Sequence, residues 1–292
     1  MIRVEVAATL NAALGESPVW DVDNQILHLI DILAQKIHQL DPARGTVRSV
    51  AIDGVPGAIA LRRDGGYVGG IGLDFATIGP DGSVTPIARA SAGHRVNDGK
   101  CDARGRFIAG TMDRNERRGA AALYQLHVDG TLTELLSDVT LSNGLDWSPT
   151  GDTLYHVDTT LERVDAFDYD LDSGQIGERQ PFADLKDVPG RPDGLTVDAE
   201  GGVWVAVARA GVVHRYDRNG RLDAVVEFPT PIVTSCTFGG RDLGELYVTS
   251  SRALLPESQR AQDPLAGCVF VVEGLGVRGR PPHRYGGAEQ AS

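Results

Sequence analysis

The chain has 292 residues, and its 28 lysines and arginines against 40 aspartates and glutamates give a formal net charge of −12. A negative field of this size repels phosphate backbones and anionic lipid, so we expect neither nucleic acid nor a membrane surface as a partner. Hydrophobic residues make up 41% of the chain, which is typical of a globular protein, and no apolar run approaches the roughly 20 residues of a membrane-spanning helix.

The first residues, 1–6, alternate between apolar and polar types in the sequence MIRVEV. A secretory signal would instead begin with a basic segment followed by an apolar one. The pattern therefore predicts a cytoplasmic protein.

Three cysteines are spread over the chain, namely Cys101, Cys236 and Cys268. A disulfide framework needs more of them, and a thiolate zinc site needs pairs of cysteines a few residues apart. We therefore expect free thiols that are mostly buried.

Short strands recur from one end of the chain to the other. Apolar runs alternate with turns that contain many of the 36 glycines, and long helical periodicity is rare. After an alternating segment at 2–10, the strand-like runs that follow a turn are 26–32, 67–71, 107–111, 154–158, 203–208 and 245–250. This pattern favours an all-β fold.

The turns also share a register, because one residue in each unit stands eight positions before a turn residue. These six residues are Glu16, Gly57, Asn97, Asn143, Asp193 and Cys236. Their spacing of 40 to 50 residues is typical of propeller blades or of an α-solenoid, and the units have little room for helix pairs. We predict a six-bladed β-propeller that forms a single domain over residues 1–292.

The two ends of the chain have different expected roles. Segment 2–10 can supply the outer strand of the last blade, which would close the ring and pair its edge. The polar, proline-containing segment 251–266 is expected to be a long loop, and residues 278–292 a flexible tail.

The six equivalent residues should meet around the channel, since the innermost strand of each blade lines it. Glu16, Asn97, Asn143 and Asp193 carry carboxylate or amide oxygens, which are the donors that a hard divalent cation prefers. Taken singly, the Asn-Gly and Asp-Gly pairs could simply be turns. Their shared position at the start of a strand favours a central axial metal site over turns.

Five motifs and a closing segment match one known family in collinear order. They are residues 14–20 (LGESPVW), 95–100 (RVNDGK), 110–112 (GTM), 142–148 (SNGLDWS), 191–195 (RPDGL) and 236–240 (CTFGG). Together they resemble the regucalcin (senescence marker protein)/gluconolactonase family over nearly the whole chain. The resemblance implies a six-bladed propeller with one divalent cation on its axis, and hydrolysis of sugar lactones to aldonic acids.

The resemblance also implies roles for single residues. The cation would be held by Glu16, Asn143 and Asp193, with Ca²⁺ the first choice before Zn²⁺, Mn²⁺, Mg²⁺ or Fe²⁺. Arg95 and Asn97 would contact the sugar, with Asn97 also near the ion. An acidic residue often found in the following loop is matched by Glu116, although this loop is shorter than in the regucalcin branch.

Lactone hydrolysis on such a site needs an ion, a base and a held substrate. The ion would act as a Lewis acid on the carbonyl of a gluconolactone-like aldonolactone, and Asp193 would be the general base, with a metal-bound hydroxide as the other possible nucleophile. Arg95 and Asn97 would orient the sugar hydroxyls. The expected partner is a small-molecule sugar lactone, and the expected state is a monomer or weak homo-oligomer.

Two alternatives use the same cation. One is a phosphotriester hydrolase, in which the ion polarises P=O instead of C=O. The other is a non-catalytic calcium-binding propeller, since this fold hosts many binding proteins. A serine hydrolase is disfavoured because no serine lies in a GxSxG motif.

Overall fold

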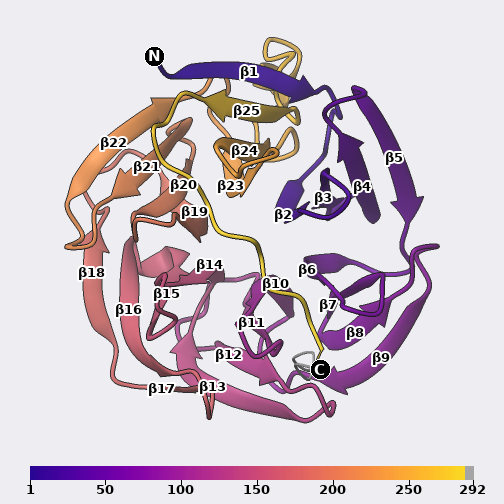
Figure 1. Cartoon of the computed structure of the whole chain (residues 1–292), viewed down its shortest axis with the longest axis vertical. Helices are drawn as coiled ribbons and strands as arrows, with labels where there is room; N and C mark the ends of the chain where they lie inside the picture. Colours follow the sequence, from indigo (N-terminus) through magenta and orange to yellow (C-terminus); the bar gives the residue numbers. More distant parts are fainter. Residues whose placement is uncertain (287–292) are drawn as a thin grey trace.

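Six small antiparallel sheets surround one axis in the computed structural model, which describes residues 1–286 (Figure 1). In blades 1 to 5 the first strand in sequence lies next to the axis and the following strands lie progressively outward. The predictions of an all-β fold and of a six-bladed propeller are both confirmed.

Each of the first five blades uses consecutive strands. Blades 1 to 3 are β2 (Gly15–Asp21), β3 (Ile26–Asp31), β4 (Lys36–Asp41) and β5 (Thr46–Ala51); β6 (Pro56–Leu61), β7 (Tyr67–Ile71), β8 (Asp74–Ile78) and β9 (Val84–Arg89); and β10 (Arg95–Cys101), β11 (Phe107–Met112), β12 (Ala121–Leu126) and β13 (Leu132–Val139). Blades 4 and 5 are β14 (Ser142–Trp147), β15 (Thr153–Asp158), β16 (Arg163–Asp170), β17 (Gln175–Ile176) and β18 (Gln180–Asp184); and β19 (Arg191–Val197), β20 (Val203–Ala208), β21 (Val212–Tyr216) and β22 (Leu222–Glu227).

The two ends of the chain together complete blade 6. It contains β23 (Val233–Gly239), β24 (Glu245–Ser250) and β25 (Val269–Glu273), and its outer strand is β1 (Arg3–Ala8). Strand β1 pairs antiparallel with β25, with Val4 opposite Val272. The predicted closure of the ring by the N-terminal segment is therefore confirmed.

The hydrophobic core lies between neighbouring blades. Phe75 of blade 2 and Phe107 of blade 3 contact each other edge to face, with ring centroids 6.1 Å apart. Trp20 of blade 1 stacks on Tyr247 of blade 6 at 5.4 Å. Because each innermost strand is covered by blades on both sides, strands such as β2, β6 and β23 are buried along their whole length.

Glycines allow the innermost strands to approach each other backbone to backbone. A Cβ atom on Gly57 would lie 1.8 Å from the carbonyl oxygen of Val96 in the next blade, and one on Gly144 would lie 2.2 Å from the amide nitrogen of Leu195. Neither obstacle is a flexible side chain. The blades can therefore pack this closely only where these positions lack a side chain.

Replacing Gly57 with alanine is expected to lower the free energy of unfolding by about 3 kcal/mol, because the added methyl forces blades 2 and 3 apart. Gly45 provides the control, since its backbone is left-handed and no atom lies within 4 Å of the place that a methyl group would occupy there. Gly45→Ala should cost only about 1 kcal/mol, from backbone strain alone. Urea denaturation measures both values, and equal losses would refute the steric explanation.

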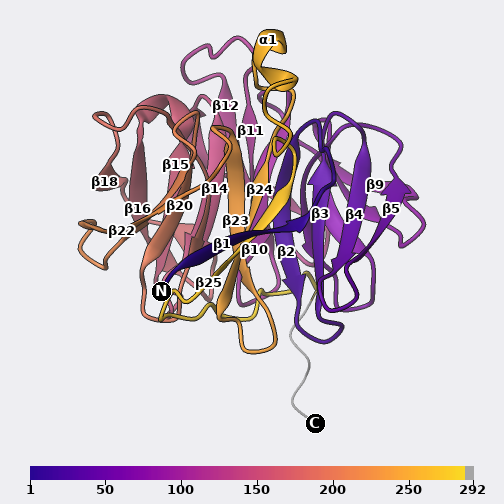
Figure 2. The same cartoon turned by 90° about the horizontal axis from the view of Figure 1, so that it is seen from above.

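The long loop of blade 6 and the end of the chain lie on opposite faces of the ring. We call the face where the innermost strands begin the upper face, and the face where they end the lower face. Residues 251–266 form the predicted loop on the upper face, interrupted by the single helical turn α1 (Glu257–Arg260) (Figure 2). No helix in the described part of the chain is long and apolar enough to cross a membrane.

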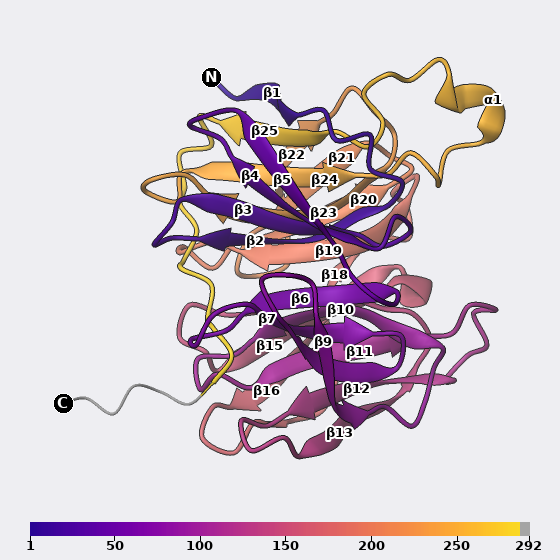
Figure 3. The same ribbon diagram turned by 90° about the vertical axis from the view of Figure 1, so that its right-hand side faces the viewer.

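Residues 278–286, which we call the strap, cross the lower face and contact all six blades (Figures 1 and 3). The sequence predicts a flexible tail from 278 onward, whereas the strap follows a defined path; residues 287–292 lie outside the described part. The strap forms at least one hydrogen bond with each blade. Taken in order from blade 1 to blade 6, one bond for each blade is Arg284 Nη2 to Asp21 Oδ1 (2.7 Å), Tyr285 N to Leu61 O (2.8 Å), Tyr285 Oη to His127 O (2.9 Å), Arg280 Nη2 to Trp147 O (2.6 Å), Ala199 N to Arg278 O (2.8 Å) and Gly279 N to Leu243 O (2.8 Å).

Candidate metal centre

A β-bulge interrupts each innermost strand near the upper face. The pairing shifts between Glu16 and Val19, Pro56 and Ala58, Val96 and Asp98, Ser142 and Leu145, Pro192 and Leu195, and Val233 and Cys236. A bulge bends its strand and redirects a side chain, which is why bulges are frequent beside active sites. Of the six equivalent residues predicted from the sequence, five lie at the start of these bulges or inside them, whereas Cys236 is the residue at which pairing resumes.

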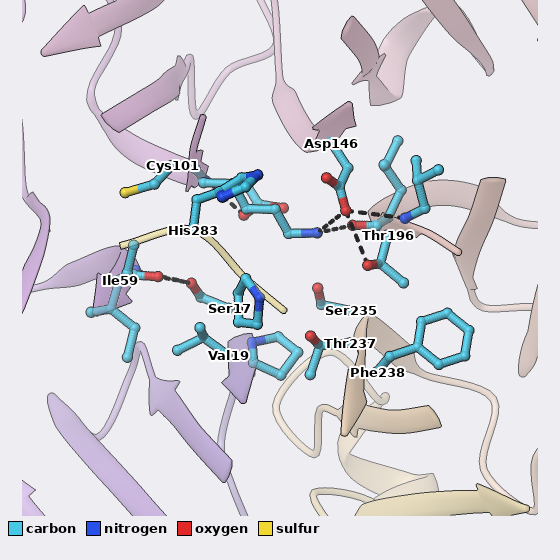
Figure 4. Close-up of a pocket in the computed structure, with 18 of the residues that line it drawn as sticks. Ser17, Val19, Ile59, Cys101, Asp146, Thr196, Ser235, Thr237, Phe238 and His283 are labelled. Carbon is cyan, nitrogen blue, oxygen red and sulfur yellow. Dashed lines mark hydrogen bonds and ion pairs between the residues drawn. The ribbon is translucent and has the colours of Figure 1, made fainter. Parts of the chain in front are cut away.

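Ser17 fixes the backbone beside Glu16. It has a φ of 49°, in the left-handed region, and its hydroxyl accepts a hydrogen bond from the Ile59 amide at 2.9 Å. The same hydroxyl donates to the Ile59 carbonyl at 3.3 Å (Figure 4). This contact ties the bulge of blade 1 to blade 2. It also holds the buried Glu16 side chain at the inner surface of the ring.

Three carboxylates influence one another at this level of the channel. Burial and the negative charge of Asp98 raise the pKa of Asp193 to about 8, against the opposing effects of Asn143, Arg191 and Arg95. Burial, Asp193 and Asp98 likewise raise the pKa of Glu16 well above its usual range. The pKa of Asp98 rises to about 6 through burial. Such a cluster is the electrostatic environment that a bound cation would relieve.

Two amide side chains have fixed orientations beside these carboxylates. Asn97 donates from Nδ2 to the Ser142 carbonyl at 2.6 Å, and Asn143 donates from Nδ2 to Thr159 Oγ1 at 2.9 Å. Thr159 in turn donates to the Pro192 carbonyl, so its hydroxyl oxygen accepts from Asn143. Since both amide nitrogens are used in this way, the two amide oxygens are the groups left to act as ligands.

Arg95 is the cationic side chain of this cluster. Burial lowers its pKa to about 10, partly offset by the attraction of Glu16 and Asp193, so it stays charged at neutral pH. One guanidinium nitrogen donates to the Val96 carbonyl at 2.9 Å. When ionised, the two predicted carboxylate ligands, Glu16 and Asp193, carry a formal charge of −2, which fits one divalent cation, while Lys100 acts on Asp98. The oxygen-only donor set fits Ca²⁺ or another hard ion.

Glu116 is the one predicted site residue that does not lie on an innermost strand. It belongs to the loop between β11 and β12 on the upper face, and its carboxylate accepts two hydrogen bonds from Arg191, at 2.7 and 3.1 Å. Arg191 begins the strand that carries Asp193. The loop is therefore connected to the candidate centre through Arg191.

The predicted position of Cys236 in the ring is wrong by two residues. Thr234 lies in the bulge of blade 6 and donates to the Gly15 carbonyl at 2.6 Å. Cys236 instead packs in the core beside Trp204. Counting back from the turn misplaced the register because the first hairpin of blade 6 has one more residue on each strand between its bulge and its turn: Cys236 pairs with Val248, whereas Leu195 of blade 5 pairs with Val205. All three cysteines are free and buried, as predicted.

Asp98 is a site residue that sequence reasoning missed. Strict alternation along β10 would turn its side chain away from that of Asn97. The bulge between Val96 and Asp98 breaks this alternation, so that Asp98 also lines the channel. The sequence signal was an acidic residue directly after Asn97. Only the position of the bulge shows that this side chain also faces the channel.

A polar cavity of about 50 Å³ lies in the channel below the bulges (Figure 4). Lys100 crosses it from blade 3 and donates to Asp146 Oδ2 of blade 4 and to the Leu195 carbonyl of blade 5, both at 2.9 Å. Thr196 also donates to Asp146, at 3.1 Å. Strap residues 280–283 form the lower wall, so the candidate centre lies between this cavity and the upper face.

Comparisons with known proteins agree with this architecture. Residues 14–252 match the family described as SMP-30/Gluconolactonase/LRE-like region. Regucalcin of Xenopus laevis is 38% identical over 98% of this chain and 99% of its own length. The structure of a calcium-binding protein, regucalcin, from Agrobacterium tumefaciens superposes with a TM-score of 0.91 at 30% identity, covering 97% of each chain.

A second solved structure, a luciferin-regenerating enzyme, has a TM-score of 0.90 and 30% identity, covering 98% of this chain and all of its own. These likenesses extend over every blade, including the ends of the chain that lie outside the matched region 14–252. The family resemblance predicted from the motifs is thereby confirmed. The chain belongs to the SMP-30/gluconolactonase/LRE-like family.

Proposed function

We propose that this protein hydrolyses a sugar lactone to the corresponding aldonic acid with the help of one divalent cation, Ca²⁺ in the first instance. The observation that carries this proposal is the cluster of three carboxylates, Glu16, Asp98 and Asp193, with the half-buried Arg95 close to Glu16 and Asp193. Membership of a family named in part for gluconolactonase supports the reaction class.

The proposed ligands are Glu16, Asn143 and Asp193, with Asn97 close to the ion. When bound, the cation would supply Lewis-acid polarisation of the lactone carbonyl. It would also favour the ionised form of Asp193, whose pKa of about 8 in the metal-free fold would otherwise keep it largely protonated at pH 7. The ionised carboxylate can then take a proton from the attacking water.

Arg95 and Asn97 are the proposed substrate-holding residues. The Arg95 guanidinium uses one nitrogen to donate to the Val96 carbonyl, which leaves further N–H groups of its planar fork for hydroxyl or carbonyl oxygens of the sugar. Asn97 is fixed through its amide nitrogen and presents its oxygen. Held donors and acceptors of this kind orient a substrate before reaction, which lowers the entropic part of the barrier.

The test is pH-stat hydrolysis of five- and six-carbon sugar lactones by metal-stripped protein, measured above the spontaneous rate. Ca²⁺, Mg²⁺, Mn²⁺, Zn²⁺ and anaerobic Fe²⁺ are restored one at a time. We expect turnover only with a cation present. Metal-independent turnover, or none with any pair, would contradict the proposal, and hydrolysis of phosphotriesters alone would favour the first alternative.

A calcium-binding role without catalysis is the second candidate, because one solved relative is described as a calcium-binding protein. The centre has few protein ligands, which leaves room for water or substrate and favours catalysis. Isothermal titration with Ca²⁺, combined with the lactone panel, separates the two. Tight Ca²⁺ binding without turnover of any lactone would favour the binding role.

Cation binding is expected to release protons, on the order of one per ion at pH 7, because Glu16 and Asp193 have raised pKa values in the metal-free fold. The apparent affinity should therefore increase with pH up to about 8 and level off above it. Titration calorimetry at pH 7 in PIPES and in Tris, two buffers that differ in ionisation enthalpy, measures this release from the difference in heat. A heat that does not depend on the buffer would contradict the raised pKa values.

A further inference from the structure

We propose that Arg191 is a positioning residue: it holds Glu116 and thereby latches the blade 3 loop, residues 113–119, across the upper end of the channel. The part of this inference that concerns substrate binding rests on the proposed lactonase function. The latch itself does not, because it is a property of the fold.

The pair connects two blades that are not neighbours. Glu116 belongs to blade 3 and Arg191 to the innermost strand of blade 5, so the loop must pass over the upper end of blade 4. In agreement with this path, the Asp113 amide donates to the Thr140 carbonyl at 3.0 Å, and the Gly119 amide to the Thr140 hydroxyl at 3.2 Å. Thr140 precedes the strand that carries Asn143. The loop therefore passes beside the start of the strand that carries a proposed metal ligand.

The base of the loop is rigid. Asp113 is fully buried and accepts hydrogen bonds from the backbone amides of Asn115 (3.1 Å) and Arg117 (2.9 Å). Its carboxylate also pairs with the side chains of His94 (2.9 Å) and Arg117 (3.0 Å). These contacts fix both arms of the loop, so that Glu116 is the part that projects toward blade 5.

Glu116 has a strained backbone that its environment must stabilise. Its φ of 50° lies in the left-handed region, which is unfavourable for a residue with a side chain. Such conformations persist where surrounding contacts hold them, and they concentrate at functional sites. The two hydrogen bonds from Arg191 are the ion pair that holds this side chain.

The geometry of the pair leaves Glu116 able to bind a ligand. A carboxylate has about four acceptor positions, and the forked contact with Arg191 uses two of them. The other two can accept hydrogen bonds from hydroxyls of a polyhydroxylated substrate. Fixing this acceptor in advance would strengthen substrate binding, because less conformational entropy is lost when the substrate enters. Arg191 would thus act through Glu116 and not by touching the substrate.

The competing explanation is an ordinary surface ion pair, since the two side chains are 34% and 43% exposed and such pairs contribute little to stability.

Cleavage by trypsin distinguishes a latch from an ordinary surface ion pair. The loop contains three cleavage sites, Arg114, Arg117 and Arg118, whereas the bond after Arg191 is not one because proline follows. We expect trypsin to cleave the loop of the native protein about tenfold faster in Arg191→Met and in Glu116→Gln than in the unsubstituted protein. The double variant should be cleaved no faster than either single variant.

The matched control is Arg89→Met, which breaks an equally short ion pair with Asp74 at the outer edge of blade 2 (2.7 Å) and should leave the loop resistant. Arg191→Lys, which keeps the charge, should restore part of the resistance. Cleavage rates that are unchanged in Arg191→Met would overturn the latch. This outcome does not depend on whether the protein is a lactonase.

Kinetics on the best lactone test the positioning role. Arg191→Met should raise KM about tenfold, as expected for one lost hydrogen bond to a charged group, with kcat changed less than about threefold. Glu116→Gln should do the same, and the double variant should equal either single variant. Additive effects, an unchanged KM, or a loss of cation affinity by calorimetry would overturn the role, the last because Arg191 would then act on Asp193.

Discussion

Replacing Asp193 with alanine is expected to lower cation affinity by more than about 100-fold and lactone hydrolysis by at least about 10³-fold. The substitution removes a proposed ligand and the proposed base at once. Glu16→Ala should lose the cation to a similar degree while keeping the base. Titration calorimetry and initial rates over a range of cation concentrations measure the two effects separately.

Asp193→Asn should make the metal-free protein more stable than the unsubstituted protein at high pH. The pKa of Asp193 is higher in the folded than in the unfolded chain, so ionisation weakens the fold as the pH rises from about 4 toward 8. Asp193→Asn lacks this loss. In the presence of a chelator, its melting temperature should match that of the unsubstituted protein below about pH 4 and exceed it increasingly as the pH rises to 8.

Asp74→Ala, on the outer part of blade 2, is the control for both measurements, because it removes a carboxylate that is remote from the channel in the topology. It should leave cation affinity, activity and the pH dependence of melting unchanged. An Asp193→Ala protein that binds the cation and keeps full activity would refute the proposed centre. If the melting temperature of Asp193→Asn depends on pH in the same way as that of the unsubstituted protein, the raised pKa of Asp193 is refuted.

The blades could be predicted from sequence because their signals are local. Each hairpin consists of a short segment of alternating residues and a glycine turn, and the recurrence of this segment reveals the repeat. The ring register was predictable for the same reason, except at Cys236, where a longer paired hairpin hides the true position of Thr234. The closing strand β1 follows from the need to pair an edge.

Features that depend on contacts between distant segments were not predictable in this way. The bulge that turns Asp98 into the channel depends on how β10 pairs with β11. The pairing of Glu116 with Arg191 joins residues 75 positions apart across an intervening blade. Neither contact leaves a periodic signal in a single sequence. Both modify the candidate site more than they modify the fold, which is why the fold was predicted more completely than the site.

The strap shows the same limit most clearly, because its composition is that of a flexible tail. Its hydrogen bonds reach all six blades, and every blade contributes at least one group in or at the end of its first hairpin link. A window of sequence around 278–286 contains none of these partners. Stability here comes from the completed ring and not from local propensity, so the strap should fold only after the blades have assembled.

Truncation after Leu275 is expected to destabilise the protein by about 5 kcal/mol, since several hydrogen bonds worth about 1 kcal/mol each and the buried Tyr285 are lost. Truncation after Gly286 leaves the strap in place and should have no effect. Urea denaturation compares the two chains. If the shorter chain does not fold, Arg280→Met removes only the hydrogen bonds to the Trp147 and Ser148 carbonyls and the ion pair with Asp146 at 3.6 Å, and it should cost about 2 kcal/mol.

The strap should also control access to the channel from below. Cys101 lines the polar cavity together with strap residues 280–283, and it belongs to the same buried cluster as Tyr285. With Cys236 and Cys268 replaced by serine, we expect Cys101 to react slowly with a thiol reagent in the full chain and at least about tenfold faster after truncation at Leu275, because the reaction requires exposure. Equal rates in both chains would mean that the cavity opens by another route, and that the strap holds the blades together without sealing the channel.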